Sequence, residues 1–286
     1  MKLTTGALTA LPLLVALFPF SALAAPQVGE VYEIKLSYEN TSKSADGYSN
    51  SSASGHTVIE EHVIAIRDDG LILRYDLPAS TEPNERPRQW QLPVDILKAK
   101  DGTLKLIDPG QLEKRRDVWL ATAKIPAKSC GQWYFSWAAF KIECDVQSAL
   151  DIVSAYRIPE NLKTGDAYSE SGTLALAVFT REEHKTLDTW VAKLDIDPDY
   201  IRRQNAQADV IVGQISRQPV SFDAALEKQR QRDITGSITV TVNQDRTGNP
   251  MCLVRETLIR ILSPDGQILN VRKRELIERK LVKTAP

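Results

Sequence analysis

The segment ITGSITVTV at residues 234–242 alternates apolar and hydroxyl side chains, with a glycine in one apolar position. Side chains of a β-strand point to opposite faces in turn, so a period of two predicts a strand with one buried face. Two further alternating segments follow at residues 251–262 and 268–281. Short polar turns join them, including a Pro-Asp-Gly turn at residues 264–266. The C-terminal end is therefore predicted to be a three-stranded antiparallel meander.

The region after residue 30 repeats this pattern. Apolar side chains occupy every second position from Tyr32 to Tyr38. Later alternating runs come in pairs, and an Asp-Gly dipeptide, which suits a tight hairpin turn, separates the members of each pair. The strands of these two predicted hairpins lie at residues 58–66, 71–77, 90–96 and 104–106.

Residues 39–55 interrupt the strand pattern with a stretch rich in Ser, Asn, Gly and Asp. Such a composition buries little apolar surface, so it predicts a mobile loop. We expect this loop to be dispensable for folding, because the cost of closing a loop depends only logarithmically on its length.

Helix signals are scattered among the strands. Asp108 and Pro109 combine a capping carboxylate with a proline at the first helical position, and helix formers follow to residue 124. Asp145 is a candidate cap for a second helix, which should end before Pro159. Two more helices are expected at residues 198–207 and 221–232. Further strands are expected at residues 173–179, 187–196 and 209–215.

These elements predict an α+β fold in which β-structure dominates. We expect an antiparallel meander sheet, curved and with a half-barrel as one form it can take, carrying three or four short inserted helices. Residues 25–160 form one β-rich half with hairpins, one or two helices and the cysteine loop. Residues 161–286 form a second half with two short helices and the C-terminal meander. The alternative is one continuous domain.

The first 24 residues have the pattern of a signal peptide. Lys2 precedes an apolar run at residues 7–20, and Ala22-Leu23-Ala24 matches the small-x-small pattern of a cleavage site. No later stretch approaches the ~20 apolar residues that a membrane-spanning helix needs. We therefore expect an exported, soluble protein in the periplasm, with an extracellular location as the alternative and peripheral membrane contact left open.

Three cysteines occur in a chain that is expected to reach an oxidising compartment. Thirteen residues separate Cys130 from Cys144, and closing such a loop would stabilise the fold by roughly 3 kcal/mol. We predict this disulfide. Cys252 lies in an apolar strand pattern, where a buried free thiol is the main interpretation and an intermolecular bridge the alternative.

Charge and motifs exclude several classes of function. The 36 basic and 37 acidic residues are interleaved, so no nucleic-acid partner is predicted. No G-x-S-x-G elbow, Ser-x-x-Lys pair or phosphate-binding glycine loop occurs, and no cofactor is predicted. Glu-Glu-His appears at residues 60–62 and 182–184, but one imidazole at each place falls short of a zinc site, so no metal is predicted. A hydrolase that uses a pair of carboxylates is not excluded by the absence of these motifs, because the two residues can be far apart in the sequence.

Aromatic residues concentrate in the cysteine loop, namely Trp133, Tyr134, Phe135, Trp137 and Phe140. One interpretation is a strand that packs under a helix as core. The other is a wall for an acyl chain or a docking surface for a partner. The candidate ligand-binding residues are Trp90, Trp133, Phe135 and Trp137.

The leading hypothesis is an exported, non-catalytic envelope protein that binds an apolar ligand or lipid-linked cargo. The ligand would lie on the concave side of the sheet, beneath the helices that begin near Asp108 and Asp145. The alternatives are a structural or adaptor subunit that contacts another envelope protein, and a hydrolase without a recognisable motif. Its partners would be a hydrophobic small molecule or another envelope protein.

Overall fold

The computed structural model describes residues 26–47, 50–135, 139–183, 187–245 and 248–284. The predicted signal peptide and Trp137 lie outside the described residues. Within the described part of the chain, none of the helices is both long enough and apolar enough to cross a membrane.

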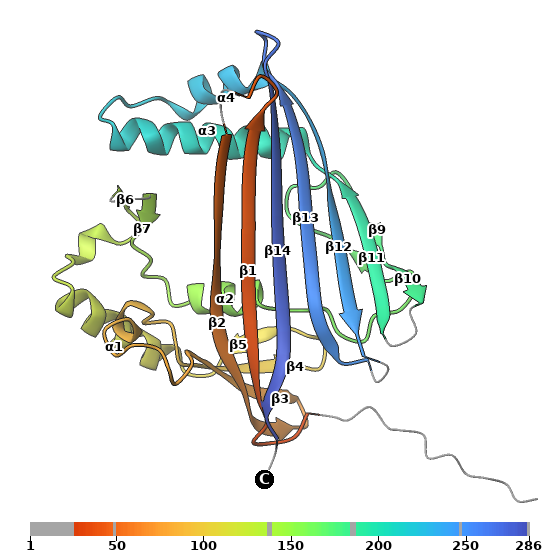
Figure 1. The fold of residues 1–286 in the computed structure, drawn as a ribbon. Coiled ribbons are helices and arrows are strands. Elements are labelled where there is room, and N and C mark those ends of the chain that lie inside the picture. Colours follow the sequence, from red (N-terminus) through yellow and green to blue (C-terminus); the bar gives the residue numbers. More distant parts are fainter. Residues whose placement is uncertain (1–25, 48–49, 136–138, 184–186, 246–247, 285–286) are drawn as a thin grey trace, which may run out of the picture.

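One large antiparallel sheet dominates the molecule (Figure 1). It has ten strands in the order β10-β11-β12-β13-β14-β1-β2-β3-β4-β5, and in the described residues its edge strands β10 and β5 do not pair with each other. The bounds are β10 Thr180–Glu183, β11 Asp188–Asp195, β12 Asp233–Gln244, β13 Pro250–Leu262, β14 Ile268–Lys283, β1 Val31–Ser44, β2 Asn50–Arg67, β3 Gly70–Asp76, β4 Val94–Ala99 and β5 Leu104–Leu106. The predicted β-dominated α+β fold is confirmed.

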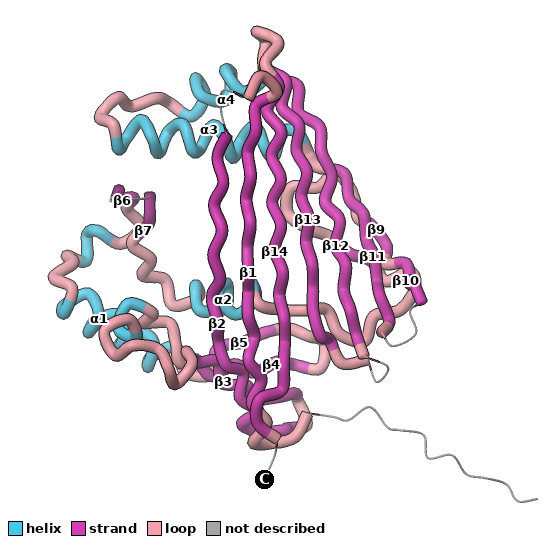
Figure 2. The backbone as a smooth tube through the Cα atoms, in the orientation of Figure 1, coloured by secondary structure: helices cyan, strands magenta, loops and turns pink. Residues whose placement is uncertain are grey.

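In the described part of the chain, four α-helices and two small hairpins accompany the sheet. Helices α3 and α4 cross one end of the long strands, whereas α1 and α2 lie toward the other end (Figure 2). The helices are α1 Pro109–Thr122, α2 Ser148–Ala155, α3 Pro198–Ile215 and α4 Phe222–Arg230, with short 3-10 turns at Arg86–Arg88 and Ala127–Ser129. The small hairpins pair β6 Trp133–Phe135 with β7 Ala139–Lys141, and β8 Ala167–Tyr168 with β9 Ala177–Val178.

The first and last strands meet in the middle of the sheet. Strand β1 pairs with β14 on one side and with β2 on the other. Ile34 therefore lies between Ile59 and Arg279, and the next inward position, Leu36, lies between Thr57 and Ile277. Strands from both sequence halves thus form one hydrogen-bonded sheet.

The alternation in the sequence matches the two faces of the sheet. Along β12, Val240 and Val242 are fully buried, while Thr239 and Thr241 at the alternate positions are only half-buried. The inward side chains of the neighbouring strands join them in one core under the helices. The C-terminal meander predicted from residues 234–242 onward is confirmed as β12, β13 and β14.

The helix cap predicted at Asp108 is present, and Ser221 caps α4 although only the start of a helix was expected there. The carboxylate of Asp108 accepts a hydrogen bond from the backbone N–H of Gln111, 3.1 Å away, and the hydroxyl of Ser221 accepts one from Ala224. Asp145 lies further from its helix, because α2 begins at Ser148 with Gln147 as the capping residue.

The prediction of a loop at residues 39–55 is wrong for residues 39–44 and 50–55, which are strand; residues 45–47 form a turn, and residues 48–49 lie outside the described residues. Strands β1 and β2 continue through this stretch and pair as far as Lys43 and Asn50. Strand β1 is central in the sheet, so its backbone groups bond on both sides whatever its side chains are, and this pairing overrides the polar composition.

The prediction of a strand at residues 209–215 is also wrong. Helix α3 runs on to Ile215 and packs against α4, where the amide of Gln229 donates to the Asp209 carboxylate. A short apolar run is compatible with either a strand or a helix, and here the second helix decides. The strand expected at residues 173–179 is reduced to β9 and an isolated bridge between Thr173 and Ile196.

Candidate ligand-binding site

An apolar groove of about 590 Å³ lies on the inner face of the sheet. Leu36 of β1 and Ile59 of β2 contribute the sheet side, and Leu92 lies in the segment before β4. Ile152 and Tyr156, from α2 and its C-terminal cap, contribute the helix side. We call this space the apolar groove; its volume is in the range of ordinary ligand pockets.

The sequence of α2 explains how the groove is built. Ala149 and Val153 point into the core and are fully buried. Residues three and four positions apart share a face of a helix, which places Ile152, Ala155 and Tyr156 together along the groove. Helix α2 therefore packs against the core with one side and lines the groove with another.

A small space, which we call the neck, shares the lining residue Tyr156 with the groove. This space of about 30 Å³ is lined by Ile34, Tyr75 and Tyr156, among others. The hydroxyl of Tyr156 donates a hydrogen bond of 2.7 Å to the hydroxyl of Thr57. The Tyr156 ring therefore separates the groove from the space beyond the neck.

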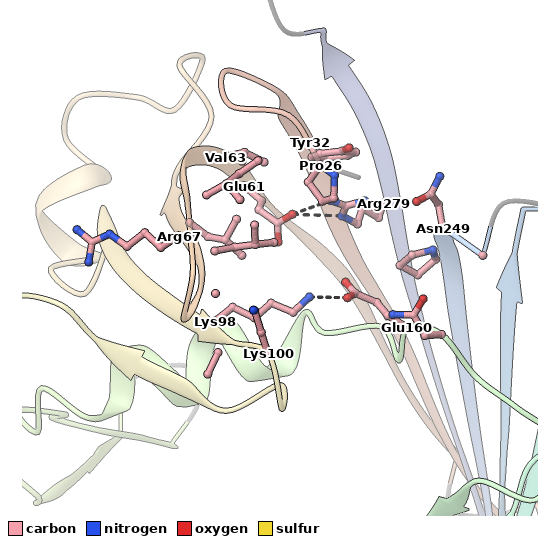
Figure 3. A pocket seen from close by; sticks show the side chains of 18 residues that line it. Pro26, Tyr32, Glu61, Val63, Arg67, Lys98, Lys100, Glu160, Asn249 and Arg279 are labelled. Carbon is pink, nitrogen blue, oxygen red and sulfur yellow. Dashed lines mark hydrogen bonds and ion pairs between the residues drawn. The ribbon is translucent and has the colours of Figure 1, made fainter. Parts of the chain in front are cut away.

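Beyond the neck lies a second cavity of about 400 Å³, which we call the charged cavity (Figure 3). Apolar side chains such as Val63 and Leu73 form much of its wall. Its charged lining residues are Glu61, Arg67, Lys98, Lys100, Glu160 and Arg279. The cavity thus joins an apolar wall to a cluster of charges.

A buried ion pair lies in the wall of the charged cavity. Nη2 of Arg279 is 2.7 Å from Oε1 of Glu61, and the side chains are only 14% and 11% exposed. The other carboxylate oxygen of Glu61 accepts a 2.7 Å hydrogen bond from the Tyr75 hydroxyl. The guanidinium of Arg279 also lies 3.4 Å from the ring centroid of Tyr32, in a cation–π contact.

This arrangement shifts the pKa values of its members. Burial, followed by the negative charge of Glu61, raises the pKa of Tyr75 well above its ordinary value. Burial by itself would lower the pKa of Arg279, but the charge of Glu61 and its hydrogen bond more than offset this and raise it. Arg279 therefore stays charged and Tyr75 stays neutral at ordinary pH.

A second ion pair closes another side of the charged cavity. Nζ of Lys98 in β4 is 2.6 Å from Oε2 of Glu160, which lies in the segment after α2. Figure 3 shows both side chains pointing toward each other, while Arg67 points away from the two ion pairs. The segment after α2 is thereby tied to the strand side of the cavity.

Of the four aromatic residues predicted to bind a ligand, the two whose side chains are described, Trp90 and Trp133, line neither space. Trp90 is 3% exposed and stacks on Trp119 of α1, with ring centroids 6.5 Å apart. Trp133 lies in β6 and is 41% exposed. The backbone of Phe135 lies in β6, its side chain is outside the description, and Trp137 lies outside the described residues. Neither Trp90 nor Trp133 lines the groove or the charged cavity, although Gln89 and Leu92, on either side of Trp90, do line the groove.

The cysteine loop forms a stapled hairpin. Cys130 and Cys144 are disulfide-bonded with their Cα atoms 5.5 Å apart, as predicted, and Cys252 is a free, half-buried thiol. The hairpin β6–β7 between the bonded cysteines lies outside the large sheet. The rings of Tyr134 and Phe140 stack on each other, and the residues are 38% and 44% exposed, so they are not sheet core.

The charged residues of the site were not identified from the sequence, although their positions on the strands indicate them. Glu61 follows Ile59 and precedes Val63 at inward positions of β2, and Arg279 follows Ile277 in the same way on β14. A charge at an inward position of a half-buried strand is costly unless it is paired. Their pairing across the sheet, however, cannot be read from local sequence.

Among the described residues, no group of three or more His, Cys, Asp or Glu side chains is arranged to hold a metal ion. The carboxylates in the charged cavity, Glu61 and Glu160, are each paired with a basic side chain.

Comparison with known proteins gives only distant likenesses. No model of a protein family and no curated protein sequence matches the chain. Among solved structures it is similar to lipovitellin, in a structure described for lipid–protein interactions, with 10% identity and a TM-score of 0.39 over 91% of this chain. The chain spans 26% of the length of that lipovitellin chain.

Two bacterial structures are also similar in outline. One is Ail, the attachment invasion locus protein of Yersinia pestis, at 6% identity and a TM-score of 0.19, covering 88% of this chain and 99% of the other. The second is an outer membrane channel from Pseudomonas putida F1, at 8% identity and a TM-score of 0.24, covering 90% and 97%. The function proposed below rests on the geometry of this chain alone.

Proposed function

We propose that this chain is an exported, non-catalytic envelope protein that binds the acyl chain of a lipid or of lipid-linked cargo in the apolar groove. The observation that carries the proposal is the groove itself, a space of about 590 Å³ between the sheet and α2. Its lining also includes the polar residues Thr57, Thr81, Glu85, Arg88 and Gln89, but its larger, apolar part offers burial to hydrocarbon, and burial is worth ~25 cal/mol for each Å² removed from water. The Cys130–Cys144 disulfide supports export, because such bonds persist in oxidising compartments.

Binding of a fluorescent fatty-acid analogue tests the proposal. We expect micromolar affinity for the natural sequence, which corresponds to roughly −8 kcal/mol. Ala155→Trp places a large side chain in the groove from an exposed position of α2 and should weaken binding about tenfold or more. Ser154→Trp is the matched control, because Ser154 is exposed on the same helix and does not line the groove.

The outcomes separate clearly once circular dichroism shows that both variants are folded. Loss of binding in Ala155→Trp with unchanged binding in Ser154→Trp supports the groove as the site. Absence of uptake by the natural sequence would overturn the acyl-binding proposal. Unchanged affinity in Ala155→Trp would overturn the groove as its location.

A second candidate function is an adaptor that contacts another envelope protein through the hairpin β6–β7. It is favoured by the exposed aromatic side chains of Trp133, Tyr134 and Phe140, since Trp and Tyr are enriched at protein interfaces. Replacing both Tyr134 and Phe140 by Ser should abolish co-purification of a host partner and leave acyl binding unchanged. The ligand-binding role predicted for Trp90, Trp133, Phe135 and Trp137 stays a prediction.

A further inference from the structure

The groove and the charged cavity lie in line along strand β1. Leu36 lines the groove, Ile34 lines the neck and Tyr32 lines the charged cavity. These residues share the inner face of one strand, so the line from Tyr32 to Leu36 is about 13 Å long. Tyr156 belongs to both the groove and the neck, whereas Glu61 and Arg279 belong to both the neck and the charged cavity.

The charged cavity offers more hydrogen-bond donors than its carboxylates use. Arg279 donates to Oε1 of Glu61 from Nε and Nη2, and its Nη1 has no carboxylate partner among the described residues. Lys98 has one partner, Glu160, for its three N–H donors. Lys100 is exposed and has no ion-pair partner in the described part of the chain.

The net charge of the residues that line the cavity also favours an anion. With Arg67 left out because it points away, three basic side chains, Lys98, Lys100 and Arg279, line the cavity against two acidic ones, Glu61 and Glu160. A cavity with surplus donors and surplus positive charge favours an anion, and guanidinium and ammonium groups suit carboxylate and phosphate oxygens.

We propose that the charged cavity takes the anionic head group, a carboxylate or a phosphate, of an amphiphile whose acyl chain lies in the apolar groove. This inference rests on the function proposed above and names the chemical class of its ligand. The neck has a volume of only about 30 Å³, so a ligand that occupies both spaces must displace the Tyr156 ring from its hydrogen bond with Thr57.

Isothermal titration of the natural sequence with matched ligands tests the head-group site. The ligands are dodecanoate, dodecyl phosphate and dodecanol, which share one chain, together with inorganic phosphate as the free anion. We expect both anionic amphiphiles to bind about tenfold more tightly than dodecanol. Inorganic phosphate alone should not displace dodecanoate, because the acyl chain supplies much of the affinity.

Variants then locate the preference. Lys98→Gln/Lys100→Gln should reduce the affinity for dodecanoate about fivefold or more and leave that for dodecanol unchanged. The control Lys193→Gln/Lys280→Gln removes the same charge from exposed positions: Lys193 on β11, and Lys280 opposite Glu33 on β14. It should change neither affinity.

Each contrary outcome has a definite meaning. Equal binding of dodecanol and dodecanoate to the natural sequence overturns the head-group site and leaves the acyl-binding proposal intact. Failure of all three amphiphiles to bind overturns the proposed function itself. Displacement of dodecanoate by inorganic phosphate alone would identify a site for the free anion instead. An unchanged preference in Lys98→Gln/Lys100→Gln would overturn the charged cavity as its location, and this comparison is made only if circular dichroism shows the variant to be folded.

Discussion

Arg279 of β14 and Glu61 of β2 are 218 residues apart in the sequence and form an ion pair across strand β1. The pair connects the end of the chain to its second strand and lies between Tyr32 and Tyr75. Burying two charges is costly, and the hydrogen bonds around this pair offset the cost only while both partners are present.

Removing one partner of this pair should be strongly destabilising. Arg279→Met leaves the Glu61 carboxylate buried without its counter-ion, and we expect the free energy of unfolding to fall by about 3–5 kcal/mol. The double variant Arg279→Met/Glu61→Met should lose less than the sum of the two single variants, since it leaves no unpaired charge. Urea denaturation of all four proteins measures this coupling; additive losses would show that the pair contributes nothing.

Alkaline pH should weaken the fold through its buried tyrosines. Burial, followed by the charge of Glu61, raises the pKa of Tyr75, and burial is also the main cause of the raised pKa values of Tyr32, Tyr156 and Tyr168. Above about pH 10 the unfolded chain loses these protons first, so the folded state holds more protons and stability falls as pH rises. Below about pH 10 this contribution to stability is fully present.

Tyr75→Phe isolates one tyrosine from the others. The variant loses the hydrogen bond to Glu61, which should cost about 1–3 kcal/mol near neutral pH. Its stability should then fall less steeply above about pH 10 than that of the natural sequence, by up to about 1.4 kcal/mol per pH unit. Urea midpoints measured across this range provide the check, and parallel pH profiles for the two proteins would contradict the expectation.

Strand β1 should tolerate alanine but not proline at Thr41. This residue pairs with Ser52 on one side and Arg272 on the other, within the stretch expected from its composition to be a loop. Thr41→Pro removes a backbone donor from a central strand and should lower the free energy of unfolding by at least about 1 kcal/mol. Thr41→Ala retains that donor and should cost less. Equal stability of the two variants would indicate that this part of the sheet contributes little.

The disulfide should stabilise a local unit. Its loop carries β6 and β7, which form their own small sheet apart from the ten strands. Replacing Cys130 and Cys144 by Ser should lower the stability of the folded state by up to roughly 3 kcal/mol. Most of this loss should appear as local opening of the hairpin. Hydrogen exchange should quicken at β6 and β7 but not at β12 or β13. Peptide mapping of unreduced protein should recover Cys130 linked to Cys144 and Cys252 as a free thiol.

We propose that the two sequence halves, residues 25–160 and 161–286, fold as one unit. Without the first half, β14 would lose β1 and become an exposed edge, and Arg279 would lose Glu61. Residues 161–286 produced alone should therefore fail to unfold cooperatively, and co-expression of residues 25–160 should restore a folded complex. A cooperative transition of the isolated second half would show two independent domains.

Local sequence predicted those elements whose stability depends on nearby residues. The alternation at residues 234–242 depends on side-chain periodicity, and the cap at Asp108 depends on a hydrogen bond within three residues. Prediction from local sequence failed where a segment far away in the chain determines the secondary structure. Residues 39–44 are strand because β14 and β2 flank β1, residues 50–55 are strand because they pair with β1, and residues 209–215 are helix because α4 packs against them.

The candidate site shows the same division. The Cys130–Cys144 bridge could be predicted, because a short loop keeps both thiols close in any compact fold. Trp90 lies in the core, whereas Trp133 lies on an exposed hairpin. Both are tryptophans, so aromatic character alone could not predict which of them is buried.

The sequence by itself determined the β-dominated class and which face of each strand is apolar, because both follow from the period of the side chains along a single strand. Only the tertiary structure decided that the last strand joins the first, that Arg279 meets Glu61, and that α2 leaves a groove above Leu36 and Ile59. These are contacts between segments far apart in the chain, and their free energy depends on burial and pairing that exist only after the sheet has assembled.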